Sequence, residues 1–173
     1  MPSEPHIEIV ESTTSDQVAK IANLMRDFVA WCRWRYRDRP ELVNTYFEPS
    51  EWNNELASLG DKYGSPDGAM LLALVDGEPA GCVAMHTIGT DVCEMKRLFV
   101  TPQHHGMGLG RRLSDALIKL ARRRRFKTMR LDTGELQKEA LSLYRSLGFR
   151  KINPYYECPP VMKSRLVFME LVL

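Results

Sequence analysis

The segment from Val92 to Leu113 constrains the fold of this chain most, because the spacing of its apolar residues changes part-way along it. Val92 to Val100 is typical of a strand, whereas the residues after Gly108 repeat apolar side chains at helical spacing. Gly106, Gly108 and Gly110 alternate at the junction. Glycine lets the backbone take positive φ and approach a ligand closely, and the first N–H groups of a helix have no internal partner. The junction therefore predicts a loop that binds phosphate or pyrophosphate.

Two more predicted strands precede this junction. Met70 to Val75 and Ala80 to His86 are apolar runs on either side of Asp76-Gly77, the strongest short signal for a hairpin. Ile88 to Asp91 reads as the next turn. The centre of the chain is therefore predicted to be an antiparallel meander.

Helices and shorter strands are predicted around this meander. A capping-box spacing at Thr14 and Gln17 favours a helix from Ser15 to Trp34. The other predicted elements are a strand at 7–10, a helix at 50–59 with Ser50 as its N-cap, a loop at 60–68, a helix beginning near Gly108, a strand at 128–132, a helix around 140–147 ended by Gly148, and a strand at 167–173. The order indicates an α+β (mixed α/β) fold, a single domain over residues 1–173 with helices on a mostly antiparallel sheet.

Composition excludes several classes of protein. No apolar run approaches the roughly 20 residues that cross a bilayer, and the N-terminal segment has no secretory signal, so we expect a cytoplasmic protein that does not bind membranes. The net charge of +2 demands no nucleic-acid partner. The four cysteines form no CxxC or Cys/His cluster, so no metal site is implied.

The glycine loop fits two common nucleotide motifs poorly. A P-loop needs GxxxxGK[ST], and no such Lys-Ser or Lys-Thr pair follows here. A dinucleotide fingerprint needs GxGxxG after the first strand of a βαβ unit, but the spacing from Gly106 is GxGxG and the preceding strand belongs to a meander.

At these residues the chain resembles the GNAT family, the Gcn5-related N-acetyltransferases. Their motif [QR]xxGx[GA] follows a strand that ends in V-x-P, and here Val100-Thr101-Pro102 precedes His105-Gly106-Met107-Gly108-Leu109-Gly110. His105 stands where Gln or Arg is usual. A second family pattern, NxxAxxLYxxxGF, resembles Gln137 to Phe149, with Gln137 in place of Asn. Topology is similar over nearly the whole chain, but the specific motifs cover only residues 94–149.

The resemblance implies a GNAT-like acyl-CoA N-acyltransferase fold, with acetyl-CoA as co-substrate and direct attack by an amine in a ternary complex. It implies that the cofactor is bound by one set of residues: Leu98, Phe99, Val100, His105, Gly106, Met107, Gly108, Leu109, Gly110, Arg111 and Gln137.

The resemblance also implies two catalytic residues. Tyr144 would be the general acid for the leaving thiolate, although a core aromatic side chain is the alternative. Glu94 would be the base or position a water, although an ion pair with Lys96 is equally open. A backbone N–H near Leu98 to Val100 would stabilise the oxyanion. Strict alternation would place Glu94, Lys96, Leu98 and Val100 on one face unless a bulge shifts the register.

The acceptor amine is not specified by the sequence. In the family it would bind between the first helices and the last strands, a region where aromatic residues could line a pocket or pack in the core: Trp31, Trp34, Tyr36, Trp52, Tyr155 and Tyr156. The acceptor could be a small molecule, an amino acid or a protein amine. A non-catalytic acetyl-CoA-binding module remains an alternative, a nucleic-acid-binding protein is less favoured, and the resemblance allows a homodimer.

Overall fold

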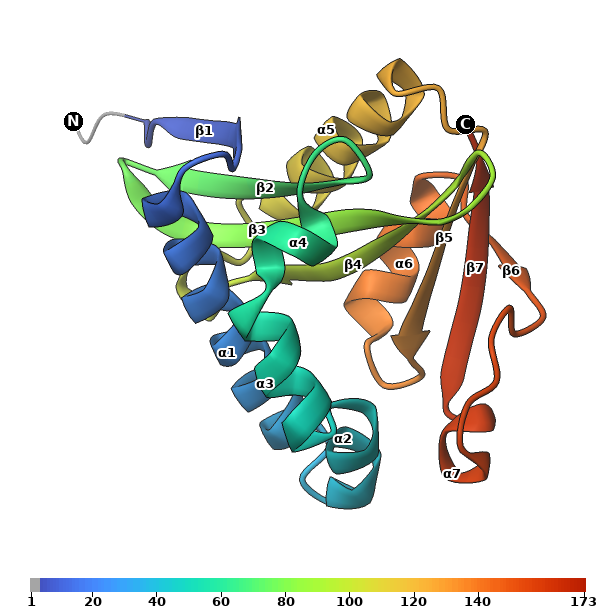
Figure 1. Cartoon of the computed structure of the whole chain (residues 1–173). Helices are drawn as coiled ribbons and strands as arrows, with labels where there is room; N and C mark the ends of the chain where they lie inside the picture. Colours follow the sequence, from blue (N-terminus) through green and yellow to red (C-terminus); the bar gives the residue numbers. More distant parts are fainter. Residues whose placement is uncertain (1–3) are drawn as a thin grey trace.

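The computed structural model describes residues 4–173, and their strands form one seven-stranded sheet in the order β1-β2-β3-β4-β5-β7-β6 (Figure 1). Neighbouring strands are antiparallel except β4 and β5, which are parallel. The mostly antiparallel α+β sheet predicted from the sequence is thus confirmed. The strands are β1 (Ile7–Glu11), β2 (Gly68–Val75), β3 (Glu78–Gly89), β4 (Val92–Val100), β5 (Thr128–Gly134), β6 (Arg150–Ile152) and β7 (Leu166–Val172).

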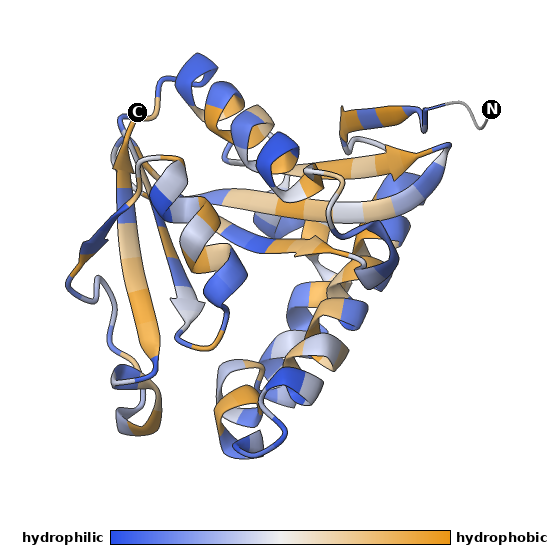
Figure 2. Cartoon of the chain, turned by 180° about the vertical axis from the view of Figure 1, so that it is seen from behind, coloured by the Kyte–Doolittle hydropathy of each residue, from blue (hydrophilic) through white to orange (hydrophobic). Residues whose placement is uncertain are grey.

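Helices cover both faces of the sheet. They are α1 (Ser15–Arg35), α2 (Pro40–Tyr46), α3 (Pro49–Ala57), α4 (Leu59–Tyr63), α5 (Leu109–Arg123), α6 (Lys138–Ser146) and α7 (Pro160–Lys163), with a short 3-10 helix at Pro102–His104. On one face of the sheet, the helices α1, α2, α3, α4 and α7 pack against the strands in one apolar cluster. On the other face, α5 and α6 pack against the strands in a second cluster. Figure 2 shows β7 and long stretches of the central strands as hydrophobic, while the helices carry both kinds of residue. The spacing of apolar residues along the strands and helices predicts that these two layers are buried.

Local signals read from the sequence correspond to observed turns and caps. The Thr14 hydroxyl accepts a hydrogen bond from the Gln17 N–H, and the Gln17 side chain returns to the Thr14 N–H, which completes a capping box. Asp76 and Gly77 both have positive φ, as a two-residue hairpin turn requires. Gly148 ends α6 with a φ of +96°.

Several predicted boundaries were wrong. The helix predicted at 50–59 runs from Pro49 to Ala57, and the side chain of Glu48, not Ser50, caps it by accepting from the Glu51 N–H. The segment 60–68, predicted to be a loop, contains most of α4. Helices α2 and α7 were not predicted, because each is too short to show a periodic pattern.

The decisive feature for function is the divergence of β4 from β5. Their ladder joins only three residue pairs, from Val92–Thr128 to Glu94–Arg130, although both strands continue. A bulge follows at Arg97, whose φ is +60°, and shifts the register against β3. Strict alternation along β4 is therefore wrong: Leu98 and Val100 pack on the α5 face with Met95, away from Glu94 and Lys96.

Within residues 4–173, no helix is both long and apolar enough to cross a membrane.

Candidate functional site

A surface groove runs over the ends of β4 and α1 to the start of α5 and α6. Ten of the eleven residues predicted to bind a cofactor line it: Leu98, Phe99, Val100, His105, Gly106, Gly108, Leu109, Gly110, Arg111 and Gln137. Met107 does not line it and packs instead against Val75, Ala80 and Leu109. The sequence motif is therefore gathered along one continuous surface.

The glycine loop forms the floor of this groove. Gly106 and Gly108 have φ of +82° and +72°, and Gly108 is the N-cap of α5. A Cβ built on either glycine meets no atom within 4 Å, so these positions require glycine for their backbone conformation and open towards space. The first N–H groups of the fifteen-residue α5 lack intrahelical partners and favour an anion. The loop therefore fits a pyrophosphate.

His105 holds the loop against the end of β4. Its Nε2 donates to the carbonyl oxygen of Val100 at 2.9 Å. A glutamine or arginine side chain, usual at this position, also carries N–H donors. His105 differs from the usual glutamine or arginine, but it keeps a hydrogen-bond donor at this position.

The other wall of the groove is formed by α1 and α6. Arg35 forms an ion pair with Glu139 on α6, and its guanidinium lies 5.1 Å from the centre of the Trp31 ring. Trp34 also lines the groove and is 59% exposed, so of the two alternatives left open by the sequence, it lines a pocket and does not pack in the core. Arg111 hydrogen-bonds Ser146, which connects α5 to α6.

A cavity between the diverging strands continues from the groove. Phe28, Leu98 and Gln137 line both the groove and the cavity, so the two spaces meet at these residues. Tyr144 lines the cavity from α6 and is 6% exposed. Burial, with a smaller contribution from the charge of Asp132, raises the pKa of the Tyr144 phenol, which therefore keeps its proton at neutral pH.

Gln137 and Gly134 shape the boundary between the two spaces. The Thr133 hydroxyl donates to Gln137 Oε1 at 3.1 Å, and the Leu136 N–H donates to the Tyr36 hydroxyl at 3.3 Å. A Cβ on Gly134 would lie 1.9 Å from the Tyr36 hydroxyl oxygen. This glycine therefore permits the close approach of α1 to the end of β5.

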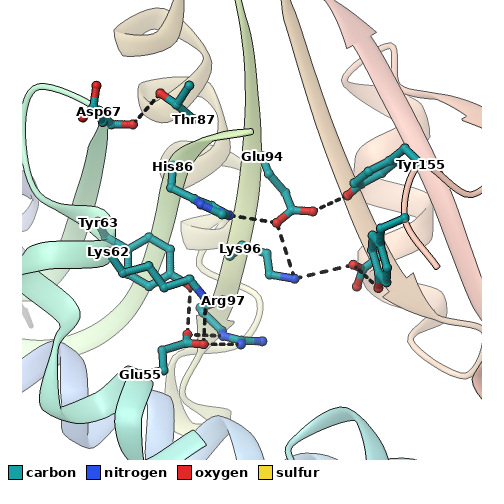
Figure 3. A network of polar contacts seen from close by, with 12 residues as sticks. Glu55, Lys62, Tyr63, Asp67, His86, Thr87, Glu94, Lys96, Arg97 and Tyr155 are labelled. Carbon is teal, nitrogen blue, oxygen red and sulfur yellow. Dashed lines mark hydrogen bonds and ion pairs between the residues drawn. The ribbon is translucent and has the colours of Figure 1, made fainter. Parts of the chain in front are cut away.

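Glu94 lies in a polar network and lines neither the groove nor the cavity. Its carboxylate lies between His86 and Tyr155, with His86 Nε2 at 2.9 Å, the Tyr155 hydroxyl donating and Lys96 Nζ at 3.6 Å (Figure 3). Burial opposes the charge, but the contacts with His86, Lys96 and Tyr155 outweigh it and lower the pKa of Glu94 from 4.5 to about 2.

Asp132 on β5 is a functional candidate that the sequence did not reveal. Among residues 4–173 it is the one carboxylate that lines the cavity, and its side chain is 1% exposed. Tyr46 and Tyr156 donate hydrogen bonds to it, the latter at 2.8 Å, and Lys96 Nζ lies 3.5 Å away. Burial lowers the Lys96 pKa, but Asp132 and Glu94 together outweigh burial and raise it.

The β4 bulge carries a second buried ion pair. Arg97 donates two hydrogen bonds of 2.9 Å to Glu55 of α3 and lies 5.1 Å from the ring centres of both Phe47 and Trp52. Burial alone would raise the pKa of Glu55, but its hydrogen bonds and ion pair with Arg97 and its contact with Lys62 outweigh burial and lower the pKa to about 2. The positive φ of Arg97 was not readable from the sequence, because arginine rarely takes it.

Solved structures share this architecture. An acetyltransferase from Streptococcus agalactiae superposes with a TM-score of 0.72 at 21% identity, covering 96% of this chain and 98% of that one. The PaiA N-acetyltransferase from Thermoplasma acidophilum, solved in complex with coenzyme A, superposes with a TM-score of 0.71 at 17% identity, covering 97% and 99%. The fold is that of the acyl-CoA N-acyltransferases.

Sequence comparison gives the family. The model of the Acetyltransferase (GNAT) family matches residues 28–149, and the chain belongs to this family. An uncharacterized N-acetyltransferase of Schizosaccharomyces pombe is 41% identical over 109 residues, which are 62% of this chain and 67% of that protein. The chain spans less than half the length of several other curated relatives that it matches.

Proposed function

We propose that this protein transfers the acetyl group of acetyl-CoA to a primary amine by direct attack in a ternary complex. The observation that carries the proposal is the meeting of the groove and the cavity at Leu98 and Gln137, with Tyr144 among the residues that line the cavity. Cofactor and acceptor could thus reach each other from opposite sides. The family's name and a neighbour crystallised with coenzyme A support this assignment of the groove.

In this proposal, the α5 N-terminus and the glycine loop bind the pyrophosphate of acetyl-CoA. The last residue pair between β4 and β5 is Glu94–Arg130, so β5 does not bond the backbone of β4 between Leu98 and Val100. The N–H and C=O groups on that side of β4 are therefore available to the pantetheine arm and the thioester carbonyl. A backbone N–H there would stabilise the oxyanion, a contribution of about 3 kcal/mol for a well-placed donor.

Tyr144 is proposed to protonate the leaving thiolate. Among the hydrogen bonds of residues 4–173, none is made by its hydroxyl, so the proton is free to be donated into the cavity. The amine nitrogen forms a bond to the acetyl carbon, the carbon–sulfur bond breaks, and CoA leaves as a thiol. The proton lost by the amine returns to the Tyr144 oxygen through the polar groups of the cavity, which restores the phenol after each transfer.

Glu94 is proposed to position its neighbours, not to act as the base. A carboxylate with a pKa near 2 is a weak base at neutral pH, and the Glu94 side chain does not line the cavity. Its contacts instead hold Tyr155, His86 and Lys96 in place, and of these Lys96 lines the cavity.

Calorimetric titration with acetyl-CoA tests the proposal, with ATP as a control. We expect micromolar or tighter binding of acetyl-CoA and much weaker binding of ATP. The matched variants are Gly108→Ala in the loop and Gly77→Ala in the β2–β3 turn, since both glycines have positive φ and open space around them. Both changes should cost about 1–2 kcal/mol of stability, but only Gly108→Ala should weaken acetyl-CoA binding.

Failure of acetyl-CoA to bind would overturn the proposal. Tight binding with no acetyl transfer to any amine would instead favour a non-catalytic acetyl-CoA-binding module.

A further inference from the structure

The bulge in β4 lies directly beside the point where the groove and the cavity meet. Arg97 lines the cavity, and the next residue, Leu98, lines both spaces. Within the bulge, β4 has these two residues opposite a single residue of β3, Val83. The conformation of the bulge therefore sets the direction of the backbone groups at this meeting point.

The peptide group that joins Arg97 to Leu98 has a defined orientation. The Cys82 thiol of β3 donates a hydrogen bond to the Arg97 carbonyl oxygen at 3.5 Å. The C=O and N–H of a planar trans peptide point in opposite directions, so the Leu98 N–H points away from Cys82. On the other side of β4, the ladder with β5 ends at Glu94. The direction of this N–H donor thus depends on the conformation of Arg97.

Arginine is an unfavourable residue for this backbone conformation. The φ of Arg97 is +60°, which lies in the left-handed region that favours glycine. A residue with a Cβ keeps such a conformation only where its surroundings hold it. If those contacts were lost, a return to negative φ would relieve the strain and turn the peptide group before Leu98.

Contacts of the Arg97 side chain can hold the strained backbone. Glu55 of α3 accepts two hydrogen bonds of 2.9 Å from the guanidinium, which also lies 5.1 Å from the centre of the Trp52 ring (Figure 3). The side chains of Arg97 and Glu55 are 7% and 9% exposed. Glu55 is fixed in turn by Lys62 Nζ at 2.9 Å and by the Tyr63 hydroxyl at 2.8 Å. This buried bidentate pair joins the bulge firmly to α3.

We infer that Glu55 is a positioning residue for acetyl transfer, which holds Arg97 so that the Leu98 N–H is directed at the thioester carbonyl of acetyl-CoA. This inference rests on the proposed function and adds the side chain that orients its oxyanion donor. Glu55 lines neither the groove nor the cavity, so it acts through Arg97 and touches no substrate.

Infrared spectroscopy tests this role without an acceptor amine. Acetyl-CoA that is isotopically labelled at its thioester carbonyl is bound to the purified protein, and the carbonyl stretching frequency is compared with that of free acetyl-CoA. A hydrogen bond to the carbonyl oxygen polarises the C=O bond and lowers this frequency. We expect a lowered frequency in the natural protein and loss of most of this shift in Glu55→Ala. Glu51→Ala, an exposed position on the same helix, should keep the full shift.

Two double variants separate positioning from a general effect on stability. Glu55→Gln with Arg97→Gly and Glu55→Gln with Arg97→Ala both remove the ion pair without leaving a buried charge unpaired. Glycine takes positive φ without a Cβ penalty, whereas alanine does not. We therefore expect the shift to persist with glycine and to be lost with alanine. Calorimetry with CoA, which lacks the acetyl group, should give affinities within about twofold of the natural protein for both folded variants.

The outcomes separate this inference from the proposed function. An unshifted carbonyl in the natural protein, a full shift in folded Glu55→Ala, or equal shifts in the two double variants would overturn the positioning role. Each of these results would leave acetyl-CoA binding in place. If Glu55→Ala does not fold, the two double variants decide. Failure of the natural protein to bind acetyl-CoA would overturn the proposed function instead.

Discussion

The ionised state of Glu94 should stabilise the fold, and the size of this effect follows from its contacts. Lowering its pKa from 4.5 to about 2 means that the folded protein favours the charged carboxylate by about 3 kcal/mol, since each tenfold change in proton affinity is worth about 1.4 kcal/mol. Because the folded pKa is depressed, this stability is present above pH 4.5 and is lost as the pH falls towards 2. Roughly 2 kcal/mol of it should be gone at pH 3.

Glu94→Gln removes the charge while keeping an amide that can still contact His86 and Tyr155. We expect the variant to be about 3 kcal/mol less stable than the natural protein at pH 7, with the difference shrinking to about 1 kcal/mol at pH 3. Urea unfolding followed by circular dichroism at both pH values measures this convergence. Other carboxyl groups titrate equally in both proteins and cancel in the comparison.

Glu78→Gln is the matched control, because Glu78 is exposed at the start of β3. It should change stability by less than about 0.5 kcal/mol at either pH. A constant stability difference between the Glu94→Gln and natural proteins from pH 7 to pH 3 would refute the reasoning, since the network would then contribute through packing and not through charge.

Three further changes probe the site. Tyr144→Phe should lower turnover by roughly 10²–10⁴-fold with acetyl-CoA affinity near that of the natural protein, as measured by steady-state kinetics and calorimetry; unchanged turnover would remove Tyr144 from the mechanism. Gly134→Ala should destabilise the fold by about 1–3 kcal/mol in urea unfolding, because its Cβ would overlap the Tyr36 hydroxyl, and adding Tyr36→Phe should recover part of the loss. His105→Ala should weaken acetyl-CoA binding about fivefold by releasing the Val100 contact, whereas His105→Gln, which keeps a donor, should bind like the natural protein; equal loss in both would contradict this role.

Local patterns in the sequence were sufficient for the elements with strong signals. The Asp76-Gly77 turn, the capping box at Thr14 and the glycine junction each depend on a few neighbouring residues, so their chemistry can be read directly. The glycine loop of the groove followed from the same reasoning, because it is one continuous segment, whereas Gln137 and the other cofactor-binding residues were implied by the resemblance to the GNAT family.

The acceptor side depends on contacts between distant segments and could not be predicted. Asp132 meets Tyr46 across 86 residues of sequence, and Glu94 meets Tyr155 across 61. The bulge in β4 changes which side chains lie on the same face of the sheet. The residue types around Arg97 do not predict this bulge. A signal was available for His86: counting back from the predicted turn places it nearly opposite Glu94 on the adjacent strand.

The short ladder between β4 and β5 has a consequence for the lifetime of the protein. Beyond Glu94, the N–H groups of β4 that point away from β3 have no strand partner and exchange their hydrogens readily, and a bound pantetheine arm would protect them. Ligand at a hundred times its dissociation constant would add about 2.7 kcal/mol to the free energy of unfolding. We therefore expect resistance to proteolysis to rise and fall with acetyl-CoA supply, so that the abundance of the protein would follow the metabolic state of its surroundings.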